Sequence, residues 1–200
     1  KKTPVTIKKL SKNKIINKKD INYVKDHSLK TPLSSNNIIG KIKNNDLDKN
    51  QNINLSNIKN KVGIILVART SSERLKNKAI KKIDKLESIA QLIIRLKRVK
   101  NCKNLILATS SHKSDDILIK IAKKYKLKYF RGSLENLSDR FYQAALNFKL
   151  DHVVRVTGDD ILRDEIMIEK GIDSHLKKSC DVTITANMPY GTQTEIFSIG

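Results

Sequence analysis

From Lys61 onward, short apolar runs alternate with longer amphipathic segments, and this alternation constrains the fold more than any other feature of the sequence. The first run, VGIILV at residues 62–67, is apolar throughout, as expected of a strand that is covered on both faces. Further apolar runs lie at 105–109, 128–130, 152–157, 181–185 and 194–198, and helical spacing marks 88–99, 114–125 and 138–148. The pattern predicts an α/β domain with a mainly parallel sheet and helices on both faces.

Each of the three helical segments begins with a serine, namely Ser88, Ser114 and Ser138. A serine hydroxyl can accept a hydrogen bond from the free N–H groups of a first helical turn. Acidic residues directly follow Ser114, and lysines end the same segment, which complements the helix dipole. We therefore predict that these serines are N-caps.

The first 60 residues are rich in Asn and Lys and carry only short apolar pairs. They contain a weak repeat, in which KNKIINKKDI at 12–21 matches KNQNINLSNI at 49–58. The repeat predicts short β segments around KN turns and no helix of ordinary length. We expect a small all-β domain at residues 1–58 and the α/β domain at 61–200, with the boundary near NIKNK at 57–61.

The formal net charge is +21, and the first 60 residues alone hold 14 lysines against four aspartates. An AT-biased genome favours Lys and Asn codons, so the excess of lysine can reflect coding bias rather than a nucleic-acid partner. The sequence also shows no basic strand with interspersed aromatic residues and no recognition helix, so we exclude nucleic acid as the partner. Cys102 and Cys180 are too far apart in sequence for a zinc motif. No apolar run approaches the roughly 20 residues of a membrane span, and no signal peptide is visible, so the cytoplasm is the expected location.

A basic loop follows the first predicted strand, with the sequence ARTSSERLKNK at residues 68–78. In open α/β sheets, ligands bind beyond the carboxyl ends of the strands, where this loop lies. Arg69, Arg74 and Lys78 can contact phosphate, and Ser72 and the backbone can form an anion nest. The loop matches neither a Walker motif nor a dinucleotide fingerprint. It is read either as a phosphate site or as an ordinary charged turn.

An acidic loop, GDDILRD at 158–164, follows the strand at 152–157. A carboxylate after a glycine turn, such as Asp159, suits a hard divalent cation that is bound together with phosphates. The alternative reading is a turn that leads into a helix, with Asp164 as the helix cap or as a second metal ligand. A basic and an acidic loop at one sheet edge predict a nucleoside triphosphate with its metal.

Four motifs occur in one order between Val62 and Ile199: ARTSSERLKNK, FRGSLENLSDRF at 130–141, VRVTGDDILRD at 154–164 and PYGTQTEIF at 189–197. Together they resemble the cytidylyltransferases of the spore-coat polysaccharide biosynthesis type, which are relatives of acylneuraminate cytidylyltransferase. The resemblance implies a nucleotide-diphospho-sugar transferase-like, Rossmann-like fold. It also implies transfer of CMP from CTP to a sugar of the acidic, sialic type, with release of pyrophosphate. The implied cofactor is Mg²⁺, and a homodimer is compatible with it.

The resemblance assigns a role to each matching residue. Arg69, Arg74 and Lys78 would hold the triphosphate, and Ala68 and Ser72 would contact a phosphate or the base. Asp159 and Asp164 would bind the metal. The sugar would be contacted by Asp139, Arg140 and Glu195. The sequence departs from the family at Lys76, where Pro is usual, and at Gln193, where Asp is frequent. The family's closing segment is also absent before Gly200, so we expect a truncated domain.

The first 58 residues are similar to the SAF, or antifreeze-like, domain at the C-terminus of sialic acid synthases, a small β-clip. The similarity includes IIGK at 38–41, but Asp26 stands where that family carries a substrate-binding Arg. Two other functions remain open. One is a sugar-1-phosphate nucleotidyltransferase that uses another NTP, and the other is an inactive fragment that only binds a nucleotide or a partner.

Overall fold

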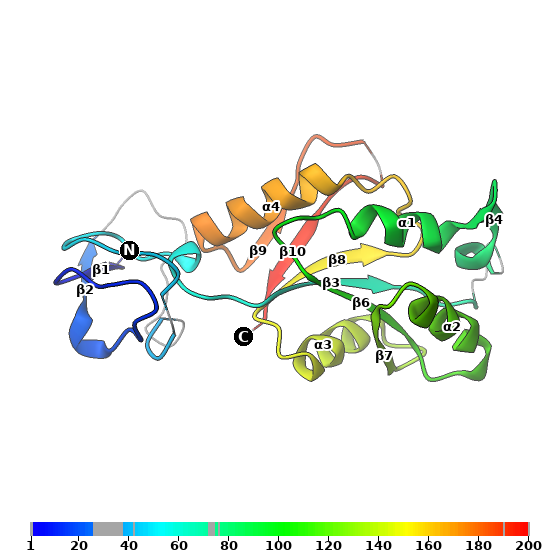
Figure 1. Ribbon diagram of the computed structural model, residues 1–200, viewed down its shortest axis with the longest axis horizontal. Coiled ribbons are helices and arrows are strands. Elements are labelled where there is room, and N and C mark those ends of the chain that lie inside the picture. The colour runs from blue at the N-terminus through cyan, green and yellow to red at the C-terminus, as the bar shows by residue number, and fades with distance from the viewer. Residues whose placement is uncertain are drawn as a thin grey trace. The chain divides into compact units, whose positions relative to one another are not determined.

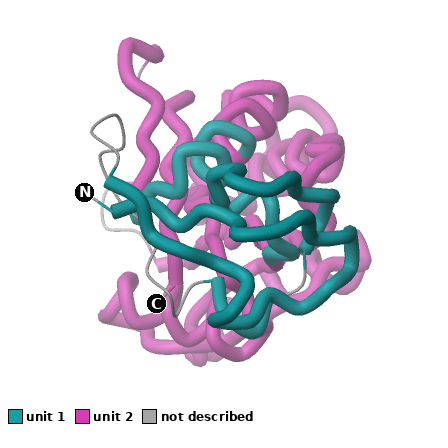
Figure 2. The backbone as a smooth tube through the Cα atoms, turned by 90° about the vertical axis from the view of Figure 1, so that its left-hand side faces the viewer, with its two compact units in different colours: residues 1–60, 173–181 teal, residues 61–172, 182–200 magenta. Residues whose placement is uncertain are grey.

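The computed structural model describes residues 2–25, 38–41, 43–71, 75, 77–189 and 191–199. The chain forms two compact units, which Figure 2 colours separately. The first unit comprises residues 1–60 and 173–181, and the second comprises 61–172 and 182–200. In the part of the chain that the structure describes, no helix is both long enough and apolar enough to cross a membrane.

The second unit is built on a six-stranded sheet in the order β7-β6-β3-β8-β10-β9. Its strands are β3 (Val62–Val67), β6 (Asn104–Ser110), β7 (Lys128–Gly132), β8 (His152–Thr157), β9 (Val182–Ile184) and β10 (Glu195–Ser198). Strand β3 is central and parallel to β6 and β8, and β7 continues the parallel part beyond β6. Strand β10 runs antiparallel to both β8 and β9. The predicted mainly parallel α/β sheet is thus confirmed, with an antiparallel edge that the sequence pattern did not reveal.

Helices cover both faces of this sheet, as predicted (Figure 1). The helices are α1 (Ser88–Leu96), α2 (Asp116–Lys124), α3 (Leu137–Asn147) and α4 (Glu165–Lys178). Helices α2 and α3 lie on one side of the strands, and α1 and the first turns of α4 lie on the other (Figure 1). The core between the sheet and α3 includes Ile65 and Val67 of β3, Ile106 and Ala108 of β6, and Ala144 and Ala145 of α3.

The serine caps were wrongly predicted for all three helices. Ser88 is the first residue of α1, and Glu87 occupies the cap position. Ser114 lies in a short 3₁₀ turn, η5 (Lys113–Asp115), which precedes α2. Helix α3 is capped by Asn136, whose side chain accepts the Asp139 N–H at 2.8 Å. Each boundary shifts by one or two residues, because the apolar spacing fixes the face of a helix better than its ends.

A short 3₁₀ turn, η4 (Lys78–Ile80), and a small hairpin of β4 (Lys82–Ile83) and β5 (Leu86–Glu87) connect β3 to α1. Lys78, the last residue of the basic loop, is therefore the first residue of η4. The residue before it, Asn77, has a φ of 58°. Asn tolerates this left-handed conformation better than most residues, so the turn can reverse at that point.

In the first unit, β1 (Lys2–Thr6) pairs antiparallel with β2 (Ile21–Lys25). Two 3₁₀ turns, η1 (Lys18–Asp20) and η3 (Leu55–Asn57), complete its regular structure within the described part of residues 1–60. The small core consists of Ile16, Ile38, Leu47, Ile53, Leu55 and Ile58. Residues 26–37, which include Asp26, lie outside the described residues.

The sequence repeat of this unit has a structural counterpart. Asn13 and Asn50, at matching positions, both adopt a φ of 62°. Leu10 and Leu47 lie just before the two repeat segments and are related by the same offset of 37 residues. Each donates its N–H to the other's carbonyl oxygen, at 2.8 and 3.0 Å. Two further pairs of backbone hydrogen bonds correspond in the same way. The Thr6 N–H donates to the Gln51 carbonyl oxygen, as the Lys43 N–H does to that of Lys14. The Ile53 N–H donates to the Pro4 carbonyl oxygen, as the Ile16 N–H does to that of Lys41. This reciprocal exchange means that the two arms are related by an approximate twofold axis.

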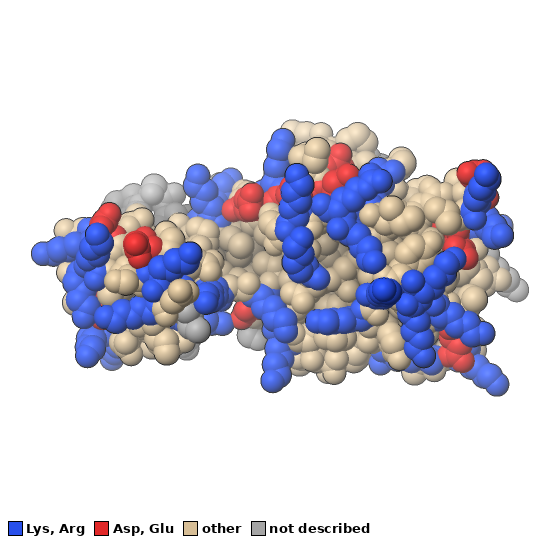
Figure 3. Space-filling model, viewed as in Figure 1, with Lys and Arg blue, Asp and Glu red and all other residues tan. Residues whose placement is uncertain are grey.

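Residues 173–181, which include the end of α4, belong to the first unit rather than the second. Leu176 packs against the small core, and the Ser179 hydroxyl accepts the Leu55 N–H at 3.0 Å. The sequence boundary between 58 and 61 did not anticipate this segment, because α4 reads as a continuous helix. Basic side chains are spread over both units on the face drawn in Figure 3.

Candidate active site

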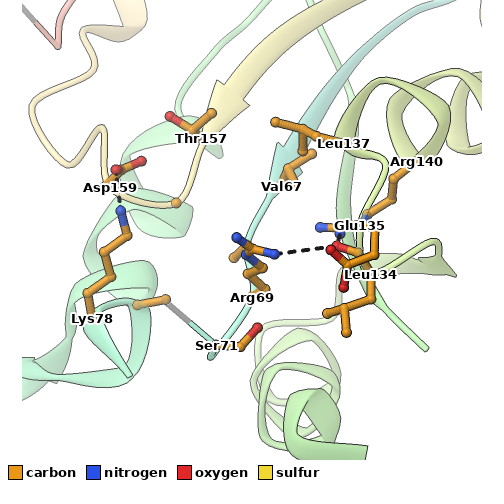
Figure 4. A pocket seen from close by; sticks show the side chains of 13 residues that line it. Val67, Arg69, Ser71, Lys78, Leu134, Glu135, Leu137, Arg140, Thr157 and Asp159 are labelled. Carbon is orange, nitrogen blue, oxygen red and sulfur yellow. Dashed lines mark hydrogen bonds and ion pairs between the residues drawn. The ribbon is translucent and has the colours of Figure 1, made fainter. Parts of the chain in front are cut away.

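A cavity of about 350 Å³ opens at the carboxyl ends of β3 and β8. Figure 4 shows the side chains that line it. Its walls come from the end of β3, the η4 turn, the loop before α3 and the turn after β8. They include Ala68, Arg69, Ser71, Lys78, Leu134, Glu135, Leu137, Arg140, Thr157, Gly158 and Asp159. The cavity therefore lies where ligands of open α/β sheets bind.

Lys78 and Asp159 meet at one side of this cavity (Figure 4). The Lys78 Nζ lies 2.5 Å from an Asp159 carboxylate oxygen, and both side chains remain partly exposed. Burial alone would raise the pKa of Asp159, but hydrogen bonds from Lys78 and Thr157 outweigh it and hold the pKa below its usual value. The Asp159 carboxylate is thus ionised at neutral pH and available to a cation or to a hydrogen-bond donor.

Gly158 lets the turn after β8 lie against the end of β3. A Cβ atom at this position would come within 2.9 Å of the Ala68 Cβ and 3.2 Å of the Val67 carbonyl oxygen. The Gly158 N–H donates to that same carbonyl oxygen at 2.8 Å. Glycine is required here because the two backbones touch, and the contact brings Asp159 beside the basic loop.

Two arginines converge on the opposite side of the cavity (Figure 4). The Arg69 Nη1 donates to the Leu134 carbonyl oxygen at 3.4 Å. Arg140 of α3 is only 1% exposed and donates to the carbonyl oxygens of Ser133 and Leu134 at 2.8 and 2.9 Å. Burial lowers the pKa of Arg140, whereas the nearby Asp115 carboxylate raises it. The two guanidinium groups and Lys78 make this cavity suitable for a polyanion.

A second cavity, of about 490 Å³, shares Thr157 and Asp159 with the first. Arg155 of β8 and Glu195 of β10, which are paired in register, form an ion pair of 2.6 Å in its wall. Asp160, the other acid of the turn, also lines this cavity and accepts from the Thr157 hydroxyl at 2.9 Å. The Asp159 turn therefore lies between two cavities that both carry charges of either sign, and in the first the cations Arg69, Lys78 and Arg140 outnumber the acids Glu135 and Asp159.

The structure brings together five of the predicted site residues, Ala68, Arg69, Lys78, Arg140 and Asp159, in the first cavity. Glu195 lies in the second cavity. Ser72 and Arg74 lie outside the described residues.

Two predicted residues lie away from both cavities. The Asp139 carboxylate accepts from the Gln143 side chain of α3 at 3.3 Å. Asp164 accepts the Met167 N–H at 2.9 Å, so it caps α4, as one of its two readings predicted. Among the residues that the structure describes, no three His, Cys, Asp or Glu side chains form a group that could hold a metal without a substrate. A single carboxylate such as Asp159 would be compatible with Mg²⁺, which needs only one or two protein carboxylates when phosphates supply other ligands.

Sequence reasoning missed several residues of the site, among them Arg155 of the second cavity. Glu135 and Thr157 line the first cavity, and both stand inside the motifs that carried the prediction. Asp115 is fully buried behind the basic loop and accepts hydrogen bonds from Thr70 at 2.7 Å. The sequence pattern indicates only an acidic first turn at this position, and the neighbouring hydroxyl residues Thr109 and Ser110 are the available sign of a different role.

Comparisons with known proteins agree with this geometry. A family model described as cytidylyltransferase matches residues 63–199. The chain is 35% identical over 134 residues to an uncharacterised protein of Methanocaldococcus jannaschii, covering 67% of this chain and 55% of that protein. It is 30% identical over 141 residues to the spore coat polysaccharide biosynthesis protein SpsF of Bacillus subtilis, covering 68% and 59%. The chain thus spans little more than half the length of these relatives.

Among solved structures, the chain is similar to a cytidylyltransferase from Leptospira borgpetersenii, with a TM-score of 0.67 and 30% identity over 70% of this chain and 61% of that one. A CMP:2-keto-3-deoxy-manno-octonic acid synthetase complexed with CTP shares the fold, with a TM-score of 0.56, 13% identity, and coverage of 69% and 74%. The family match includes both loops of the first cavity, and the chain therefore belongs to the cytidylyltransferase family.

Proposed function

We propose that this chain is part of an enzyme that transfers CMP from CTP to a sugar and releases pyrophosphate. One observation carries the proposal: the ionised Asp159, Lys78 and Arg69 line a single cavity at the carboxyl ends of parallel strands. A triphosphate needs cationic side chains for its oxygens, and its metal needs a carboxylate. The sugar hydroxyl would attack the α-phosphorus, so no covalent nucleophile on the protein is required.

The basic side chains would stabilise the leaving group. Negative charge builds on the pyrophosphate as its bond to the α-phosphorus breaks, and Arg69 and Lys78 offset that charge. Arg74 and Ser72 are proposed to join them. On binding, Lys78 would exchange the Asp159 carboxylate for a phosphate oxygen. Mg²⁺ bound to Asp159 would neutralise phosphate charge and polarise the phosphorus.

We place the acceptor sugar in the second cavity. It shares Asp159 and Thr157 with the first cavity, so an acceptor hydroxyl there can approach the α-phosphate. The ion pair of Arg155 and Glu195 offers donors and acceptors to sugar hydroxyls. Arg140 lies in the first cavity instead, and we therefore assign it to the nucleotide rather than to the sugar. From the motif resemblance, we further propose that the acceptor is an acidic sugar of the sialic type.

We further propose that the first unit is an SAF-like β-clip. The reciprocal hydrogen bonds between its two repeat arms support a compact twofold module of this kind. An SAF module beside a cytidylyltransferase would combine parts of a synthase and of the activating enzyme in one protein. Synthesis of the sugar and its activation with CTP would both take place in the cytoplasm, where CTP is made.

The deciding experiment measures phosphate release from each of the four NTPs, with candidate sugars and pyrophosphatase present. The full-length parent protein and this 200-residue chain are assayed side by side. We expect release with CTP and an acidic sugar only. Turnover of another NTP with a sugar 1-phosphate would favour the alternative nucleotidyltransferase. CTP binding without turnover in the full-length parent would favour a binding protein.

A further inference from the structure

A buried carboxylate lies directly behind the basic loop. Asp115, in the 3₁₀ turn before α2, is 0% exposed. Thr109 and Ser110 at the end of β6 are also fully buried, and Thr70 is 5% exposed. A charged group in such a place is stable only when hydrogen bonds replace its water.

The two oxygens of Asp115 contact two different parts of the chain. Its Oδ1 accepts both the backbone N–H and the hydroxyl of Thr70, each at 2.7 Å. Its Oδ2 accepts the Thr109 hydroxyl at 2.9 Å and the Ser110 hydroxyl and N–H at 2.5 and 3.2 Å. Asp115 therefore ties the segment that follows β3 to the end of β6.

The hydrogen bonds of Asp115 fix the backbone next to Arg69 and, indirectly, next to Lys78. Arg69 is exposed between two buried residues: the Ala68 N–H donates to the Ala108 carbonyl oxygen at 3.2 Å, and Thr70 is held by Asp115. The Thr70 carbonyl oxygen in turn accepts the Asn77 N–H at 3.0 Å. Asn77 directly precedes Lys78. One carboxylate thus holds the residue after Arg69 and, through one more hydrogen bond, the residue before Lys78.

We propose that Asp115 is a positioning residue that sets Arg69 and Lys78 in the geometry that binds triphosphate. The inference rests on the proposed function and deepens it, because Asp115 does not itself line the cavity. Preorganised cations bind a polyanion better than mobile ones, since binding does not have to order them. Hydrogen bonds from Ser110, Thr70 and Thr109 hold the pKa of Asp115 low although burial alone would raise it, so the acceptor stays ionised.

The test compares Asp115→Ala with Asp115→Asn by calorimetric titration with CTP on the 200-residue chain. The alanine removes both acceptors, and we expect CTP binding at least tenfold weaker. The asparagine can still present its carbonyl oxygen to the Thr70 N–H, while its amide faces the Thr109 and Ser110 hydroxyls, which can rotate and accept, and loses only the longer bond from the Ser110 N–H. We therefore expect Asp115→Asn to recover most of the affinity.

Thr109→Val is the matched control. It removes a buried hydrogen bond to the same carboxylate on the side away from the loop, so it lowers stability but should leave CTP affinity within twofold. Wild-type affinity in Asp115→Ala, or an equal loss in Thr109→Val, would overturn the inference. Should Asp115→Ala not fold, Thr70→Val against Thr70→Ser decides: we expect weaker binding only in the valine variant, and equal affinities would refute the positioning role.

Amide hydrogen exchange separates this inference from the proposed function. In Asp115→Ala the Thr70 and Asn77 amides should exchange at least tenfold faster than in the wild type. Unchanged exchange at both amides would overturn the tie between Asp115 and the loop, whatever the protein binds. A wild-type chain without affinity for CTP would overturn the proposed function, whereas the exchange rates would still test the tie.

Discussion

The Asp159 carboxylate is ionised, partly exposed and paired with Lys78. Because a partly exposed ion pair contributes little to the free energy of unfolding, removal of this charge should affect function more than stability. We predict that Asp159→Asn abolishes metal-dependent turnover and barely changes the melting temperature. Asp160→Asn is the comparison: Asp160 bonds to Thr157 and Arg163, so this variant should lower stability and reduce turnover much less than Asp159→Asn. Both variants are assayed in the full-length parent. Wild-type turnover by Asp159→Asn at saturating magnesium would end the metal-ligand hypothesis.

Arg69 and Lys78 of the basic loop should contribute directly to nucleotide affinity. Arg69→Ala and Lys78→Ala should each weaken CTP binding by ~1–3 kcal/mol, the range for charge-assisted hydrogen bonds. Lys81→Ala is the matched control, since Lys81 is an exposed lysine just after η4 that does not line the cavity. Calorimetric titration measures all three. Equal affinities for the loop variants and the control would refute the phosphate-binding role.

The cap of α3 can be tested by comparing the residue that caps the helix with the one that the sequence suggested. Asn136→Ala removes the side chain that accepts the Asp139 N–H and should lower the free energy of unfolding by about 1 kcal/mol. Ser138→Ala, at the cap position that the sequence suggested, lies inside the helix and should change it by only a few tenths of a kcal/mol, within the usual range for surface substitutions. Urea unfolding measures both, and a larger loss in the serine variant would contradict the observed cap.

The sequence predicted some strands, helices and site residues well and others poorly, for physical reasons. Apolar spacing located β3, β6, β8 and all of the first three helices, because burial on a sheet dictates which positions are apolar. The parallel order then placed Arg69, Lys78 and Asp159 at one edge. The site of Asp115 could not be found this way, because its partners Thr70 and Thr109 come from two strand ends whose approach depends on the folded sheet. The antiparallel pairing of β10 leaves no distinctive periodicity either.

The organisation of the chain in two compact units predicts where proteases cut. Limited trypsin digestion should cleave first between Ile58 and Val62, where Lys59 and Lys61 are exposed. Residues 173–181 belong to the first unit but stay covalently in the larger fragment. The two fragments should therefore separate on a denaturing gel and remain together on a native gel. Earlier cleavage within the α/β part, or persistent protection of the junction, would contradict this prediction.

That same segment carries a buried histidine that should make stability depend on pH. His175 is 1% exposed, and burial lowers its pKa to about 4, against an opposing effect of Asp181. The unfolded chain titrates near 6.5, so between about pH 6.5 and pH 4 it binds more protons than the native protein. Stability should therefore fall as the pH falls through this window, by roughly 3 kcal/mol at 1.36 kcal/mol per pKa unit.

Urea unfolding at pH 7.5 and pH 4.5 measures this loss. His175→Gln should remove most of the difference between the two pH values, because glutamine does not titrate. His112→Gln is the control, since His112 is exposed and its replacement should leave the difference unchanged. The carboxylates with lowered pKa values, Asp20, Asp115 and Asp159, lose their stabilising charge mainly as the pH falls below the unfolded carboxyl values near 4, so they contribute little above pH 4.5. Equal stability of the wild type at both pH values would show that His175 is not buried as a neutral group.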